Sequence, residues 1–180
     1  MNTKKLFILA VIAFLMVLWA FYESGLDERG NEGATVEHAL IQGLDFEGVS
    51  KIVVKGGDDT VTLKRRSNGG FSVLEKDGYP ATLRAVNRLT AGCLDIEVKD
   101  VYTSTVENFD ELGVSEDEAE NVVKFYREGD ELLTGVFVGS FKEGGEGTFV
   151  RRVDSNDVYV TYDRPYLTTS VDGYVNQRIV

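Results

Sequence analysis

The sequence is poor in the residues that most often carry chemistry. Its 180 residues include one cysteine, Cys93, and one histidine, His38. A single cysteine excludes an internal disulfide, and one histidine cannot supply a histidine-rich metal site or pair with a distant cysteine nucleophile. We therefore predict no metal, no cofactor and no catalytic residues. His38 is expected to be solvent-exposed, and Cys93 a small buried side chain.

Motifs for nucleotide, calcium and hydrolase sites are also missing. The glycine-rich stretch Gly139–Gly147 has no Lys-Ser or Lys-Thr after it, and Asp154–Asp157 lacks the glycine and distal glutamate of a calcium loop. A Ser-His-Asp triad would have to use His38, and the chain has no Gly-x-Ser-x-Gly elbow. The carboxylate runs Asp110-Glu111 and Glu116–Glu120 are typical of solvated loops and helix ends.

Basic residues are scarce. Nineteen Lys and Arg face 30 Asp and Glu, for a formal net charge of −11. Lys4 and Lys5 contribute +2 to the first 22 residues, so the remaining chain carries −13. A surface of this charge repels phosphate backbones and anionic lipid headgroups, so we predict no nucleic-acid partner.

One long run, Leu6–Tyr22, has no charge, proline or glycine. As a helix it spans about 25 Å, at the short end of what crosses a bilayer core. Lys4 and Lys5 precede it, and Trp19 and Tyr22 lie near its end, where aromatic rings favour the headgroup layer. We predict a cytoplasmic amino terminus (1–5), a membrane anchor (6–22), a flexible linker (23–34) and an extracytoplasmic domain (35–180). A cleaved signal peptide is the alternative.

Beyond the linker, alternating polar and apolar residues between glycine- or aspartate-containing turns predict strands. They cover residues 51–55, 60–65, 71–75, 96–102, 121–127, 132–138, 148–153 and 158–162, with a weakly marked first strand at 35–41. The order of strands, one helix and further strands predicts an α+β fold: the transmembrane helix, then two antiparallel β-meanders with one amphipathic helix between them.

The helix between the meanders is predicted at 81–91. Pro80 suits its first turn, and Gly92 is expected to end it. Its apolar side is expected to hold four residues: Leu83, Val86, Leu89 and Cys93. A second, short helix is expected at 106–112, and Tyr174, Val175 and Ile179 suggest another near the carboxyl terminus.

Four tyrosines in the last part of the chain are candidates for a partner surface: Tyr159, Tyr162, Tyr166 and Tyr174. Tyrosine is common in contact surfaces because its large apolar body ends in a polar group. Strand alternation places Tyr159 and Tyr162 on opposite faces, so about half of the four are expected in the core.

Several stretches together resemble the domain of unknown function 4340 family. They are Lys51–Arg65, Gly70–Val73, Phe109–Gly113, Phe137–Gly139, Phe149–Val153 and Val158–Val160. The chain departs from the family pattern at Phe71, where members usually have Trp, and at Val114–Glu116, where a Leu-Asp-Pro-like sequence is usual. The resemblance implies an anchored bacterial protein with an α+β body outside the membrane, found near gliding-motility-type ABC transporter components, with no established catalytic residues. Members are often longer, with a second related unit.

These observations favour a non-enzymatic accessory protein that binds a membrane or envelope protein in a transporter-linked complex. Two alternatives stay open. A hydrolase of envelope polysaccharide would need two carboxylates about 5–10 Å apart in one cleft. A small-ligand carrier would need an apolar pocket between helix and sheet.

Overall fold

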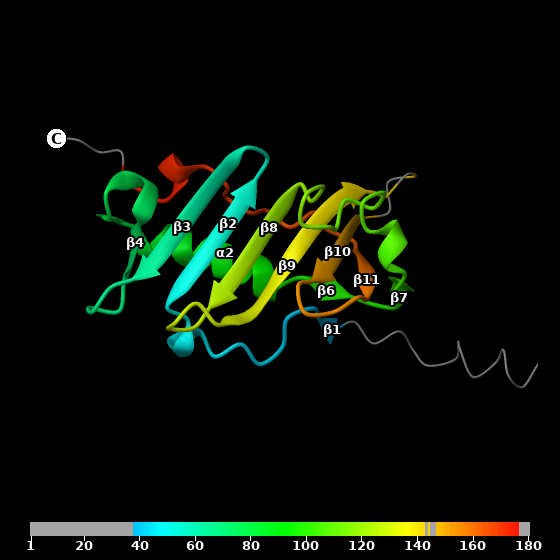
Figure 1. Cartoon of the computed structure of the whole chain (residues 1–180), viewed down its shortest axis with the longest axis horizontal. Coiled ribbons are helices and arrows are strands. Elements are labelled where there is room, and N and C mark those ends of the chain that lie inside the picture. The colour runs from blue at the N-terminus through cyan, green and yellow to red at the C-terminus, as the bar shows by residue number, and fades with distance from the viewer. Residues whose placement is uncertain (1–37, 143, 145–146, 177–180) are drawn as a thin grey trace, which may run out of the picture. The chain divides into compact units, whose positions relative to one another are not determined.

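The computed structural model describes residues 38–142, 144 and 147–176. They form an α+β domain in which one large antiparallel sheet carries a single α-helix on one face (Figure 1). The predicted anchor Leu6–Tyr22 and linker lie outside the described residues. Within the part of the chain that is described, no helix is long and apolar enough to cross a membrane.

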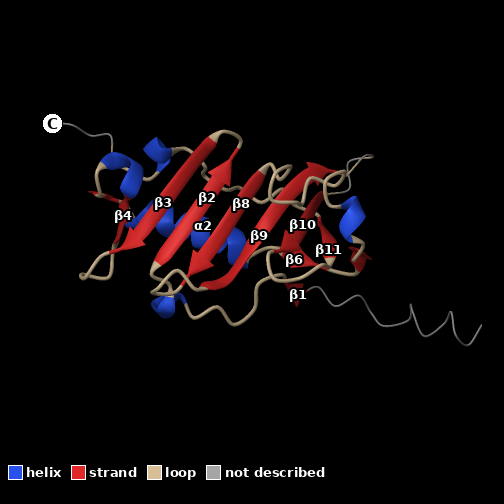
Figure 2. Cartoon of the chain, in the orientation of Figure 1, coloured by secondary structure: helices blue, strands red, loops and turns tan. Residues whose placement is uncertain are grey.

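The sheet has nine strands in the order β5-β4-β3-β2-β8-β9-β10-β11-β7 (Figure 2). Their bounds are β2 Lys51–Gly56, β3 Asp59–Arg65, β4 Phe71–Val73, β5 Tyr79–Pro80, β7 Val101–Thr103, β8 Asn121–Tyr126, β9 Leu132–Phe141, β10 Thr148–Arg152 and β11 Val158–Thr161. Strands β1 (His38–Ala39) and β6 (Glu97–Val98) form a separate two-stranded ribbon. The two predicted meanders are thus one sheet, joined where β2 pairs with β8.

Strand alternation gives the sheet one apolar face along β2 to β10 and a second, smaller apolar area over β8 to β11 on the other face. On one face, helix α2 (Leu83–Leu94) packs its buried side chains Val86, Leu89 and Cys93 into the larger core. The strand residues of this core include Ile52, Val54, Val61, Leu63, Val73, Val123, Phe125, Val136, Val138 and Val150. The opposite face has a smaller core, made of Phe109, Leu112, Val114, Val122, Phe137, Phe149 and Val158. The burial predicted for Cys93 is confirmed.

Helix α2 begins and ends later than predicted. Pro80 lies in the edge strand β5, where a missing N–H is tolerated, and Thr82 is the N-cap. This shift leaves Leu83 at the first helical position with 71% of its surface exposed, so its predicted place on the buried side was wrong. Gly92 does not end the helix. A Cβ there would lie 3.0 Å from the Tyr166 carbonyl oxygen, so the glycine permits a close approach of two chain segments.

Other strand boundaries differ from the prediction because a continuous alternating pattern can be split between elements that pair with different strands. The predicted strand 96–102 is split between β6 and β7, which belong to different sheets. The predicted strand 71–75 ends at Val73 and continues as the 3₁₀ helix η3 (Leu74–Lys76). There Glu75 turns back, and its two carboxylate oxygens accept the Thr62 N–H at 2.8 and 2.9 Å.

The remaining helical segments are single 3₁₀ turns. They are η2 Phe46–Gly48, η4 Val106–Asn108 and η5 Val171–Gly173. The short helix predicted at 106–112 is therefore η4 followed by turns, with Gly113 at a positive φ of 66°. The carboxyl-terminal helix suggested by Tyr174, Val175 and Ile179 is represented only by η5, and Ile179 lies outside the described residues.

Candidate functional site

The four candidate tyrosines separate into two pairs. Tyr174 is fully buried, and its hydroxyl donates to the Thr168 carbonyl at 2.5 Å. Burial raises the pKa of its phenol above the ordinary value. Tyr159 is half-buried, packs against the larger core and meets the His38 ring edge-on at a centroid distance of 6.0 Å. Both side chains therefore serve packing more than contact with a partner.

The second pair lies on the surface. Tyr162 and Tyr166 are 62% and 72% exposed, and both line one groove of about 450 Å³. The complete lining is Gly92, Asp95, Ile96, Glu97, Thr161, Tyr162, Asp163, Pro165 and Tyr166. We call this the tyrosine groove. It is formed where the end of α2 and strand β6 meet the chain that leaves β11.

Local sequence explains why this chain segment passes close to α2. Strand β11 ends at Thr161, whose hydroxyl donates to the Asp163 carbonyl at 3.3 Å. Arg164 then forms an ion pair with Glu120. Gly92 on the helix has no side chain to block the carbonyl of Tyr166. These contacts hold the two tyrosines at the groove without burying their rings.

The groove suits cationic and hydrogen-bonding groups. The face of a tyrosine ring attracts cations, and the Lys99 ammonium already lies 4.5 Å from the centroid of Tyr162. Carboxylates of Asp95, Glu97 and Asp163 line the same space. Among the described residues, however, no group of three or more His, Cys, Asp or Glu side chains is placed to hold a metal ion.

A buried arginine organises the opposite face of the sheet. Arg151, on β10, is only 8% exposed and stacks between Phe109 and Phe137, with its guanidinium carbon 4.2 and 4.4 Å from the two ring centroids. Nε and Nη2 donate to the Val114 carbonyl at 3.0 and 2.8 Å, and Nη1 donates to the Ser155 carbonyl at 2.9 Å. Desolvation lowers the pKa of this guanidinium. The segment 109–114 is thereby fastened across the sheet.

Gly139, on β9, and Gly113, in the segment itself, let residues 109–114 lie close against β9. A Cβ on Gly139 would stand 2.3 Å from the Leu112 carbonyl oxygen and 2.6 Å from that of Gly113. The Ser140 N–H and hydroxyl both donate to the Leu112 carbonyl at 3.1 Å. We call the unit formed by Phe109–Val114, Phe137, Gly139 and Arg151 the arginine dock.

The stretches Phe109–Gly113, Phe137–Gly139 and Phe149–Val153, far apart in sequence, therefore meet in one structural unit. The family model described as "Domain of unknown function (DUF4340)" matches residues 72–180. The chain belongs to the DUF4340 family. The resemblance drawn from these stretches is confirmed. Comparison with curated proteins and with solved structures gave no significant match.

In this DUF4340 chain, the lone histidine does meet a serine and an aspartate. His38, Ser155 and Asp157 line a pocket of about 210 Å³. The Asp157 carboxylate accepts the Ser104 hydroxyl at 2.6 Å, and the Ser155 hydroxyl accepts the Asp157 N–H at 3.1 Å. The second bond closes the turn before β11, and the first ties that turn to the chain that follows β7. His38 is exposed, as expected.

Sequence reasoning missed the carboxylates of the tyrosine groove in the DUF4340 chain. Asp163 lies within the tyrosine-rich stretch and offered a weak signal. Asp95 and Glu97 follow the helix, and no local pattern shows that they meet residues some 70 positions later. The sequence identifies Arg151 only as a member of the family stretch Phe149–Val153, because residue type alone does not show whether a side chain is buried.

Proposed function

We propose that this domain is a non-enzymatic binding module, held outside the membrane by an anchor at Leu6–Tyr22, and that a partner protein docks on the tyrosine groove. The partner is a membrane or envelope protein in a transporter-linked complex, as the family resemblance implies. The single observation that carries the proposal is the exposure of Tyr162 and Tyr166 in one groove. Tyrosine is among the residues most enriched where binding energy concentrates in interfaces.

The packing around the two rings supports this role. Tyr159 and Tyr174 pack against the core, whereas Tyr162 and Tyr166 expose apolar rings to water. Covering two such rings stabilises a complex by roughly 2–4 kcal/mol at about 25 cal/mol per Å² of apolar area. The surrounding carboxylates add electrostatic selection for a partner surface that carries lysine or arginine.

Site-specific photocrosslinking in the native membrane tests the docking surface. A benzoylphenylalanine at position 166 is expected to give one discrete adduct, whose partner is identified by mass spectrometry. The matched control is position 79, since Tyr79 is 51% exposed and lies outside the groove. Equal labelling from both positions, or none from position 166, would contradict the docking proposal.

The anchor is tested separately. The full-length chain is expected to stay with membranes in alkaline carbonate, and protease added to the outer side is expected to digest its body. Recovery of a soluble mature chain that lacks the first twenty or so residues would refute the anchor and leave the groove proposal standing.

A hydrolase is the second candidate, because three carboxylates line the tyrosine groove: Asp95, Glu97 and Asp163. Glycoside cleavage needs two carboxyl groups that flank the scissile bond in one cleft. The test is the release of reducing ends from purified envelope polysaccharide by the wild-type chain and by the Glu97→Gln and Asp163→Asn variants. If the wild-type chain releases reducing ends and each substitution abolishes that release, the domain is a hydrolase and the non-enzymatic proposal is overturned.

A further inference from the structure

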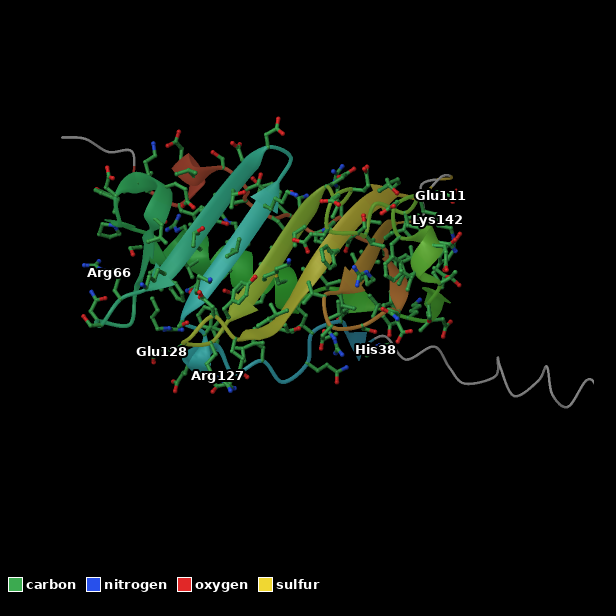
Figure 3. The ribbon with its side chains drawn as sticks, viewed as in Figure 1. His38, Arg66, Glu111, Arg127, Glu128 and Lys142 are labelled. Carbon is green, nitrogen blue, oxygen red and sulfur yellow. The ribbon has the colours of Figure 1, made fainter. Side chains whose placement is uncertain are left out.

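A second groove, of about 660 Å³, lies on the face of the sheet turned away from α2. Its floor includes Lys51, Thr62 and Lys64, which alternate along β2 and β3 with core residues such as Ile52 and Leu63. The loop that follows β3 and the turn between β8 and β9 form its walls, and Figure 3 shows Arg66 and Glu128 at the same end of the sheet. We call it the basic groove.

Positive charge exceeds negative charge in this groove. Its lining holds four cations, Lys51, Lys64, Arg65 and Arg66, against the carboxylates Glu128 and Asp130. The chain as a whole has the opposite balance, with a net charge of −11. The lining is thus a local positive patch on an acidic protein.

One of the four cations is already neutralised. The Lys51 ammonium lies 2.6 Å from an Asp130 carboxylate oxygen. That hydrogen bond and the charges of Lys51 and Lys64 lower the pKa of the Asp130 carboxyl. Lys51 is therefore occupied, which leaves Lys64, Arg65 and Arg66 to be weighed against Glu128.

A second cation, Arg65, does not present its charge to the groove. Its guanidinium lies between Phe46 and Phe71, 5.4 and 4.7 Å from their ring centroids. It donates to the backbone carbonyls of Val49 at 2.5 Å and Phe46 at 2.6 Å. Because Phe46 and Phe71 belong to the larger core, this guanidinium lies on the α2 face of the sheet. Lys64 and Arg66 therefore supply the excess of positive charge over Glu128 in the groove.

Lys64 and Arg66 are the available cations. Both are exposed, and within residues 38–142, 144 and 147–176 neither side chain forms an ion pair. Leu74, which is also exposed, lines the same groove and offers an apolar contact. The groove thus presents two cations beside one apolar side chain.

We propose that the basic groove is a second docking surface, which receives an acidic segment of a partner protein. Carboxylates of that segment pair with Lys64 and Arg66, and an apolar side chain of the segment covers Leu74. A protein segment fits better than a membrane or a nucleic acid. A short peptide meets only the groove, whereas an extended polyanion would also face the negative surface around it.

The test uses the full-length chain and a fluorescent peptide of about 12 residues that alternates Glu and Leu, with binding followed by anisotropy. The double variant K64E/R66E is expected to bind about tenfold more weakly than wild type, as close charge pairs in interfaces do. The control R84E/R88E makes the same charge change on exposed positions of α2 and is expected to weaken binding less than about threefold. All four positions are exposed, so circular dichroism should show unchanged folding.

Three results would overturn the proposal. They are equal weakening in both double variants, equal binding of the matching Lys-Leu peptide, and charge-dependent binding of vesicles containing anionic phosphatidylglycerol through Lys64 and Arg66. The tyrosine groove is independent: Y162A/Y166A is expected to leave peptide binding unchanged. Failure of this test and failure of the photocrosslinking test are therefore distinguishable.

Discussion

Removal of the Arg151 side chain is the sharpest test of how the second face of the sheet is held together. In Arg151→Ala, the Val114 and Ser155 carbonyls lose their donors, and the Phe109 and Phe137 rings lose the cation between them. Each hydrogen bond from a charged donor is worth about 1.5–3 kcal/mol. The stacking adds roughly 1–2 kcal/mol where it is desolvated.

An opposing effect reduces this sum. A buried guanidinium costs several kcal/mol to desolvate, and alanine relieves that cost. We therefore expect a net loss of about 2–4 kcal/mol in the free energy of unfolding. Arg151→Met keeps an apolar stem between the rings but leaves the carbonyls unpaired, so we expect about half of that loss. The control Arg164→Ala breaks the exposed pair with Glu120 and should cost no more than about 1 kcal/mol.

Urea unfolding followed by circular dichroism measures these differences. With a slope near 2 kcal/mol per M, the midpoint for Arg151→Ala should fall by about 1–2 M. Hydrogen exchange localises the effect: amides in 109–114 should exchange faster, while those in β2 and β3 stay protected. A midpoint equal to that of Arg164→Ala, or uniform exchange along the sheet, would refute the role assigned to the dock.

Two further predictions follow from close packing and burial. Gly139→Ala places a Cβ 2.3 Å from the Leu112 carbonyl oxygen and is expected to destabilise the domain by about 2–4 kcal/mol in urea unfolding. Gly70→Ala, where the nearest atom is 3.5 Å away, should change stability by less than about 1 kcal/mol, and similar losses for both would contradict the close approach. Burial raises the pKa of the Cys93 thiol from its ordinary 9.0 to about 12. Since the folded pKa is the higher one, the neutral thiol stabilises the fold fully below about pH 9, and this contribution is lost as pH rises toward 12. Stability should therefore fall in that window, and the native thiol should resist Ellman's reagent at pH 8 until urea is added, whereas rapid native labelling would show that it is accessible.

The sequence predicted local structure well because alternation records which side of a strand is buried. Strands β2, β3 and β8 lie within one residue of their predicted bounds, and the alternate residues Val61 and Leu63 of β3 face the core. Alternation does not record which strand lies next to which. The pairing of β2 with β8, which unites two meanders, connects residues about 70 positions apart and leaves no local pattern.

The same limit explains the errors at the helix. Pro80 fits an edge strand as well as a helix start, since both positions tolerate a missing N–H. Gly92 is a common helix terminator, yet here its role is set by the Tyr166 carbonyl beside it. In both cases the residue type was compatible with two roles, and a distant segment decided between them.

Three of the family stretches meet in the arginine dock, and this bears on where the proposed partner would bind. Phe109, Gly113, Phe137, Gly139 and Arg151 are all used inside the arginine dock, which fastens one chain segment to the sheet. Residues occupied in this way have little surface left to contact another protein. The exposed groups of both grooves, Tyr162, Tyr166, Lys64 and Arg66, are not part of the dock. The family stretches in the dock therefore account for the scaffold. We expect the proposed partners to be selected at the two grooves, one of which includes Lys64 of the family stretch Lys51–Arg65. Substitutions in the dock should alter stability and binding together, whereas substitutions in a groove should alter binding alone.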